Sequence, residues 1–239
     1  MGCFIIPQPY RIEGVEEESS RGCNRLYKML HLPSFRPTCS MTDKGDFIIM
    51  ASTEPIRDKK QLRQLADYFL QKQQLRNYVL VVLGACTALR ISDLLRLRWD
   101  DVYDSVHGQF RSRITVVEQK TGKTKMIALN PQAVRALQLY YPRRRGCYIF
   151  ESNRKEDKAI SRIQAWRIIH TAVVAIGIVG KIACHSLRKS WGYHAWTSDG
   201  VSPVVIMDVL NHSNYETTRR YLGVAQDDLD RAYLGMGLF

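Results

Sequence analysis

The feature that most constrains the fold is a change of hydrophobic period along the chain. From residue 57 onward, apolar residues recur at the spacing of amphipathic helices, beginning with RDKKQLRQLADYFLQKQ. Between residues 110 and 130, β-branched residues instead flank KTGK, which predicts a β-hairpin with its turn at Thr121–Gly122. Helical spacing then resumes. We therefore expect a mostly α fold with a small β-hairpin, of the α+β class.

Turn and capping residues mark where several predicted helices begin and end. Pro131 opens one helix, and Ser202 followed by Pro203 opens another as N-cap and first residue. Gly177 ends the helix that contains RIQAWRIIHTAVVAI. ISDLLRLRWDDV predicts one short helix, and RRRGCYIFES predicts a basic loop followed by a short strand. The longest apolar run, residues 78–89, is too short to span a bilayer and indicates a buried helix.

Residues 1–56 differ from the remainder of the chain. They show no sustained periodicity, and residues 1–50 contain six basic and six acidic side chains, so this part is neutral. We predict that residues 1–56 are poorly ordered or form an appended segment. Residues 57–239 are predicted to form the folded domain.

The net charge of +12 lies beyond the N-terminal segment, because residues 51–239 hold 29 basic and 17 acidic side chains. This balance favours a polyanionic partner, either nucleic acid or an anionic membrane surface. The six cysteines form no Cys-x-x-Cys pair, and the N-terminus lacks a signal-peptide pattern. We expect reduced thiols in a soluble cytoplasmic protein.

Four short stretches carry the residues that could perform chemistry. In ALRISDLLRLRWDDV, Arg90 and Asp93 are three apart and can meet on one helix face. In EQKTGKTKMIAL, Lys120 and Lys123 flank the predicted turn. Taken alone, the first stretch is better explained by a helix-end ion pair and the second by a solvated lysine-rich turn.

The other two stretches combine histidines with a cation or a phenol. In HSLRKSWGYHAW, His185 and Arg188 share a face at a helix start, where the helix dipole also favours an anion. In LNHSNYETTRRYLG, His212 stands in a loop nine residues before Tyr221. An amphipathic helix with a core tyrosine would explain this last stretch alone.

Taken together, these stretches resemble the catalytic domain of the tyrosine recombinases, the phage integrase family, over residues 57–239. The resemblance implies DNA cleavage and rejoining through a covalent 3′-phosphotyrosyl intermediate. It implies a set of catalytic residues in this order along the chain: Arg90, Lys120, His185, Arg188, His212 and the nucleophile Tyr221.

The implied roles follow the chemistry of a phosphodiester. The two arginines clamp the non-bridging oxygens, to which His212 also donates, and His185 helps to remove the proton of the phenol. Lys120 is the candidate general acid for the leaving 5′-oxygen, with Lys123 as the fallback. Asp93 is expected to hold the arginines in position without contacting the phosphate itself. Expected DNA contacts are Lys123, Lys125, Arg219 and Arg220.

The resemblance also implies partners. One expected partner is double-stranded DNA, and the others are further copies of the chain, which would form a tetramer through the apolar C-terminal tail. The alternative is that the tail packs within its own chain. No interaction with a membrane is expected. No cofactor is expected, because the phosphotyrosyl link conserves the bond energy without ATP or a metal. The family's N-terminal helical domain of about 80–100 residues is not evident in residues 1–50. The chain then acts alone, needs a partner, or has an incomplete N-terminal region.

Two other functions are compatible with these motifs. A DNA-binding regulator could have this fold without cutting DNA, and a type IB topoisomerase would share the chemistry. A metal nuclease is disfavoured because the sequence shows no cluster of acidic ligands.

Overall fold

The computed structural model of the chain describes residues 53–153, 157–198, 200–222, 230 and 233–236, although not the side chain of Arg220; at 39–41 and 47–49 it describes the backbone. The chain divides into two compact units, Met1–Met50 and Ala51–Phe239. In the first unit, β1 (Cys39–Met41) pairs antiparallel with β2 (Phe47–Ile49), a hairpin that the sequence analysis missed. The predicted lack of order in residues 1–56 otherwise falls largely on residues outside those described.

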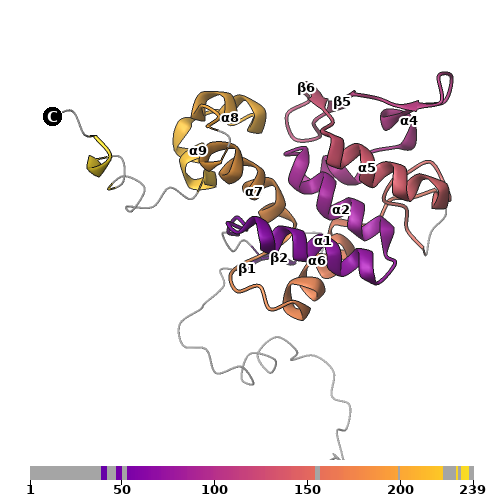
Figure 1. Ribbon diagram of the computed structural model, residues 1–239, viewed down its shortest axis with the longest axis horizontal. Coiled ribbons are helices and arrows are strands. Elements are labelled where there is room, and N and C mark those ends of the chain that lie inside the picture. The colour runs from indigo at the N-terminus through magenta and orange to yellow at the C-terminus, as the bar shows by residue number, and fades with distance from the viewer. Residues whose placement is uncertain are drawn as a thin grey trace, which may run out of the picture. The chain divides into compact units, whose positions relative to one another are not determined.

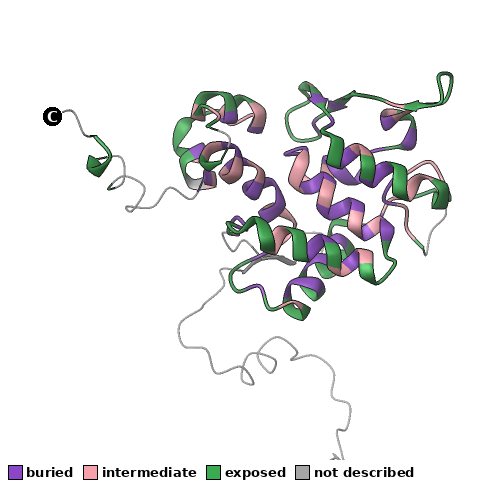
Figure 2. Cartoon of the chain, in the orientation of Figure 1, coloured by how far each residue is buried: buried purple, intermediate pink, exposed green. Residues whose placement is uncertain are grey.

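The second unit begins with two helices, the second of which is central to its packing. Helix α1 (Lys59–Gln71) begins at Asp58, whose side chain accepts a hydrogen bond from the Lys60 backbone at 2.7 Å. Helix α2 (Leu75–Cys86) buries most of its length, and α1, α5 (Pro131–Tyr140) and α7 (Cys184–Thr197) pack around it. The buried positions are visible along α2 in Figure 2. Helix α2 is thus the central element on which the others are placed.

The predicted hairpin is confirmed. Strands β5 (Arg113–Val117) and β6 (Thr124–Ala128) pair antiparallel, with Val117 opposite Thr124. The turn therefore covers residues 118–123, and Gly122 adopts the positive φ of +67° that favours glycine. Ile114 and Val116 point into the core, as period-two alternation requires. The mostly α fold with a small antiparallel β element is likewise confirmed.

The segment between α2 and β5 contains more and shorter elements than predicted. It contains two short helices, α3 (Ile91–Leu95) and α4 (Trp99–Val102), in place of one. A small pair, β3 (Tyr103–Asp104) with β4 (Gln109–Phe110), follows them and was not predicted. The break lies at Leu97, whose carbonyl accepts a hydrogen bond from the backbone N–H of Ile149, so this segment is joined to a distant one.

The strand predicted after the basic loop is wrong. The loop forms a 3₁₀ turn, η2 (Tyr141–Arg143), and the following residues make isolated bridges at Tyr148 and Glu151. Ile149 and Phe150 are fully buried, so their apolar pattern reflects core packing rather than a sheet.

Two further helices agree with the predicted capping residues. Helix α6 (Arg162–Ala175) ends before Gly177, and α8 (Pro203–Leu210) has Ser202 as its N-cap; Ser161, the N-cap of α6, was not predicted. Helices α7, α8 and α9 (Tyr215–Leu222) pack on one another beside α2 (Figure 1). In the described part of the chain, no helix combines the length and apolarity needed to cross a membrane.

Helices α2 and α7 approach closely because α2 has a glycine at the crossing. A Cβ placed on Gly84 would lie 2.7 Å from Cδ1 of Leu187, the residue just before Arg188. Because interiors are close-packed, this contact fixes where the first turns of α7 stand.

We predict that Gly84→Ala lowers stability although alanine favours helices. The helix gains about 0.5–1 kcal/mol, but overpacking against Leu187 costs about 1–3 kcal/mol. The melting temperature should fall by a few degrees. The matched control is Gly192→Ala in α7, where a Cβ would make only ordinary contacts at 3.5 Å and the melting temperature should rise. A rise in both variants would contradict this account of the crossing.

Candidate active site

The candidate site contains a buried cation, the guanidinium of Arg188, a residue that is 1% exposed. It donates hydrogen bonds to the carbonyls of Ala88, after α2, and Leu210, at the end of α8. Its Nε is also buried, and no hydrogen-bond partner for it occurs within the described residues. Burial lowers the pKa of Arg188, while Tyr221 opposes that change. Three segments distant in sequence therefore meet at one cation.

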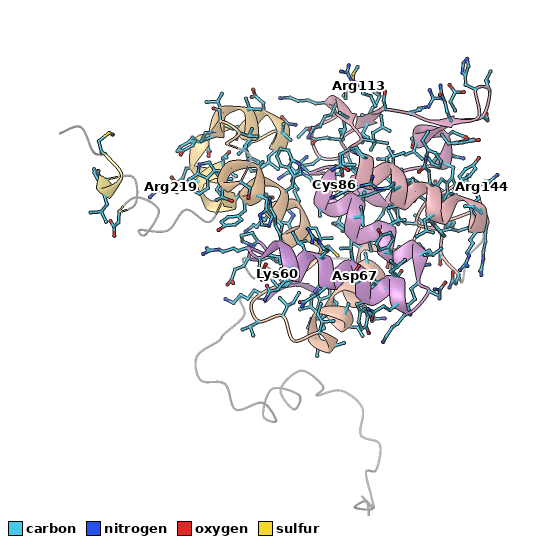
Figure 3. All side chains as sticks on the ribbon, in the orientation of Figure 1. Lys60, Asp67, Cys86, Arg113, Arg144 and Arg219 are labelled. Atoms are coloured by element: carbon cyan, nitrogen blue, oxygen red, sulfur yellow. The ribbon has the colours of Figure 1, made fainter. Side chains whose placement is uncertain are left out.

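Tyr221 lies in the last turns of α9, between the two predicted histidines. Its hydroxyl is hydrogen-bonded to Nε2 of His185 on α7. Its ring contacts the His212 ring edge-to-face, with 4.4 Å between the ring centroids. The predicted phenol and both histidines are thus together in one place. In Figure 3, α7 lies between Cys86 at the end of α2 and Arg219 on α9.

His212 is fixed by a residue that the sequence analysis did not single out. Nδ1 of His212 lies 3.0 Å from the hydroxyl of Thr218, which is fully buried. Because one ring nitrogen has this partner, the orientation of the ring relative to Tyr221 is set.

The surroundings hold both histidines neutral. Burial, followed by the charge of Arg188, lowers the pKa of His185 and of His212 to about 4. Burial also raises the pKa of Tyr221, although Arg188 and Arg90 act to lower it. At neutral pH the site therefore contains a protonated phenol bonded to an uncharged imidazole.

Arg90 stands at the start of α3 and pairs with a carboxylate that was not predicted. Its guanidinium lies 2.7 Å from Glu118, whose side chain is 1% exposed. Burial alone would raise the pKa of Glu118, but hydrogen bonds from Asn211, Arg90 and Thr121 lower it to about 2. Period-two alternation from Ile114 and Val116 does place Glu118 on the inward face, a signal that could have identified it.

Asp93 is buried and serves the hairpin rather than pairing with Arg90 as expected. Its Oδ1 accepts a hydrogen bond of 2.9 Å from the backbone of Gln119, next to Lys120. The reason is geometric, since the carboxylate of Glu118 already takes the place beside Arg90. Asp93 therefore supports the lysine-bearing turn.

The three predicted lysines of the hairpin lie in different surroundings. Lys120 and Lys123 are exposed in the turn, and Nζ of Lys123 lies 3.4 Å from Oδ1 of Asn211. Lys125, predicted to contact DNA, is half-buried and donates to the carbonyl of Val209. Burial, followed by the charge of Arg188, lowers the pKa of Lys125 to about 8. Lys125 therefore borders the site.

The remaining predicted residues lie on α9. Arg219 is largely exposed and stands 4.0 Å from Glu216, and the side chain of Arg220 is outside the described residues. Sequence analysis also missed Lys189, whose ammonium donates to Thr53 O at 2.5 Å and lies 5.2 Å from the centre of the Tyr221 ring. Residues 53 and 189 are too far apart in sequence for any local pattern to reveal their hydrogen bond.

Comparisons with known proteins show which family the chain is similar to. The model of the Phage integrase family matches residues 57–227. Probable integrase/recombinase YoeC of Bacillus subtilis is 35% identical over 191 residues, which cover 79% of this chain and 99% of that protein. Tyrosine recombinase XerA of Pyrococcus furiosus is 29% identical over 166 residues, 68% of this chain and 55% of that protein. The chain thus spans nearly all of YoeC but about half of XerA.

Solved structures share the fold. The crystal structure of XerA recombinase superposes with a TM-score of 0.62 at 23% identity, over 78% of this chain and 67% of that one. XerH site-specific recombinase, bound to palindromic difH substrate in a post-cleavage complex, gives a TM-score of 0.61 at 15% identity, over 77% and 53%.

The neutral histidines predict a loss of stability in mild acid. Between the folded pKa of about 4 and the ordinary 6.5, the unfolded chain binds more protons than the folded chain. The free energy of unfolding must therefore fall as the pH drops through this window. For His185 alone, the loss by about pH 5.5 is about 1 kcal/mol.

Urea unfolding at neutral pH and at about pH 5.5 measures this loss. Glu118, with a pKa of about 2, titrates in the folded state well below this range. His185→Gln should reduce the dependence on pH, whereas His170→Gln, which alters an exposed histidine stacked on Trp166, is the matched control. An undiminished dependence in His185→Gln would refute neutrality of that imidazole.

Proposed function

The chain belongs to the phage integrase family, and we propose that it cuts and rejoins double-stranded DNA at specific sites through a covalent 3′-phosphotyrosyl intermediate. One observation carries this proposal. The hydroxyl of Tyr221 is bonded to a neutral His185, one turn of helix from the buried Arg188. A nucleophile, a proton acceptor and an anion-binding cation are thus together, as phosphoryl transfer requires.

The first step forms a bond between the Tyr221 oxygen and phosphorus while the bond from phosphorus to the 5′-oxygen breaks. The phenolic proton passes to Nε2 of His185, which is uncharged and already hydrogen-bonded to the hydroxyl. The leaving 5′-oxygen takes a proton from the general acid. Rejoining reverses these steps, because a 5′-hydroxyl attacks the phosphotyrosyl link and releases Tyr221.

Arg90, Arg188 and His212 hold the non-bridging phosphate oxygens. The arginines come from separate segments, and Nε of Arg188 is a buried donor whose described surroundings supply no acceptor. A phosphate oxygen would satisfy that donor through a charge-assisted hydrogen bond. His212, fixed by Thr218, contributes from the other side of the Tyr221 ring.

The general acid is Lys120, in the exposed turn of the hairpin. Lys125 is a second candidate on a specific observation, because its pKa of about 8 is close to neutrality and it borders the site. A general acid is most effective when its pKa is near the working pH. Single-turnover cleavage by Lys120→Ala and Lys125→Ala distinguishes the two candidates.

Binding to DNA relies on the basic excess of residues 51–239. Lys123, Arg219 and Arg220 contact the phosphate backbone outside the reacting group. We assign Lys125 to the site rather than to this surface, given its bond to Val209. The reaction needs no cofactor, and we place it in the cytoplasm, where DNA is accessible.

The active assembly on DNA is a tetramer, in which the C-terminal tail docks on a neighbouring copy. Exposure of the described tail residues supports this, since Tyr233, Leu234 and Met236 are 81%, 87% and 68% exposed in the isolated chain. Residues 57–239 form the catalytic domain within this assembly.

We predict that Tyr221→Phe abolishes the covalent adduct while DNA affinity is retained. The substitution removes one hydroxyl and keeps the ring that packs against His212. A nicked suicide duplex traps the adduct, which is then detected on a denaturing gel. Affinity for the same duplex should fall steeply with salt in both proteins, because lysines and arginines displace counterions. Wild-type protein that binds DNA without forming an adduct would favour a non-cleaving regulator.

A further inference from the structure

Building on the proposed function, we infer that Asn211 is a positioning residue, which ties the hairpin carrying the general acid to the loop carrying His212. Its side chain makes contacts that span the two. Nδ2 donates to Oε2 of Glu118 at 2.6 Å and lies 3.2 Å from the hydroxyl of Thr121, while Oδ1 accepts from Lys123 at 3.4 Å. We call Asn211, Glu118, Thr121 and Lys123 the Asn211 clasp.

The backbone of Asn211 does not by itself require an amide side chain. It ends α8 in the left-handed conformation, with φ 49° and ψ 51°. Glycine is the residue that most often adopts this conformation at the end of a helix. The contacts of the side chain therefore identify what asparagine adds at this position.

The clasp lies where the parts of the site meet. Glu118 also pairs with Arg90 at 2.7 Å, and Asn211 directly precedes His212. The two carbonyls before Asn211, those of Val209 and Leu210, accept hydrogen bonds from Lys125 and Arg188. One amide thus connects the hairpin turn to the segment that holds the phosphate-binding groups.

The hairpin needs such a tie at its turn rather than along its strands. Ile114, Val116 and Ile127 hold the strands on the core, whereas residues 119–123, which include Lys120, are exposed. Asp93 holds the turn at the backbone of Gln119, and the clasp holds it from the opposite side of the site. Together they restrict where Lys120 stands relative to the scissile phosphate.

Asn211→Gly tests this role, since glycine keeps the left-handed backbone and removes only the amide. Single-turnover cleavage is measured on two duplexes, one with the natural 5′-oxygen leaving group and one with sulfur in its place. A thiol has a pKa of about 8.5, far below that of an alcohol, so a thiolate leaves without a general acid. Lys120→Ala is the positive control for a defect that sulfur repairs.

Misplacement of the general acid should slow Asn211→Gly about 10- to 100-fold on the oxygen substrate. On the sulfur substrate, Asn211→Gly should cleave at the wild-type rate. Thr121→Val, which removes one hydroxyl from the clasp, should show the same selective defect in weaker form. Because it leaves Asn211 intact, it also tests the tie if Asn211→Gly fails to fold in thermal unfolding experiments.

Equal slowing on both substrates would place the effect of Asn211 on the nucleophile side and overturn the inference, as would no slowing on either. If sulfur repairs Lys120→Ala, the proposed function stands whatever Asn211 does. If the wild-type protein forms no adduct with either substrate, the proposed function fails, and the inference fails with it.

Discussion

The buried guanidinium of Arg188 is the contact on which the remainder of the site depends. It bonds the carbonyl of Ala88 after α2 and that of Leu210 at the end of α8, so three helices are joined at one group. A buried carbonyl that loses its donor costs about 1–3 kcal/mol. Arg188 consequently has a structural role besides its proposed role as a phosphate ligand, and replacing it with alanine would disturb the positions of Tyr221 and His212. The isosteric Tyr221→Phe separates chemistry from folding more cleanly.

The electrostatics of the site favour an incoming anion. Arg188, Arg90 and Lys125 bring positive charge into a largely buried region, while the carboxylate of Glu118 is shared among several donors. Burial, assisted by this excess of positive charge, keeps both histidines neutral, which leaves His185 able to accept a proton. A phosphate would reduce the repulsion among the cations and satisfy Nε of Arg188, for which the described residues supply no acceptor. The charges that add to the lowering of the histidine pKa values are thus the same charges that are proposed to bind the substrate.

Local patterns predicted the elements well where caps and turns are explicit. Gly177, Ser202 with Pro203, and Gly122 each stand where the sequence placed them, because capping and turn geometry depend on neighbouring residues. The gathering of Tyr221 with His185 and His212 could be anticipated only from the order of several motifs together. Long-range pairs were not predictable, including Glu118 with Arg90 and Lys189 with Thr53, since nothing near either residue in sequence specifies its partner. The strand expected near Ile149 was wrong for a related reason, because full burial produces the same apolar run as a sheet.

The groups proposed for attack on phosphorus and the lysine proposed to protonate the leaving oxygen lie in different structural surroundings. Tyr221 and His185 are hydrogen-bonded to each other from packed helices, Arg188 is held by two backbone carbonyls, and Arg90 is paired with the buried Glu118. Lys120 instead stands in an exposed turn, in which the Gln119 backbone donates a hydrogen bond to Asp93 and Glu118 accepts one from Asn211. In the proposed reaction, attack on phosphorus therefore uses groups that the folded chain already brings together. Protonation of the leaving oxygen uses a lysine in the exposed turn of a hairpin, where core packing holds the strands and polar contacts hold the turn.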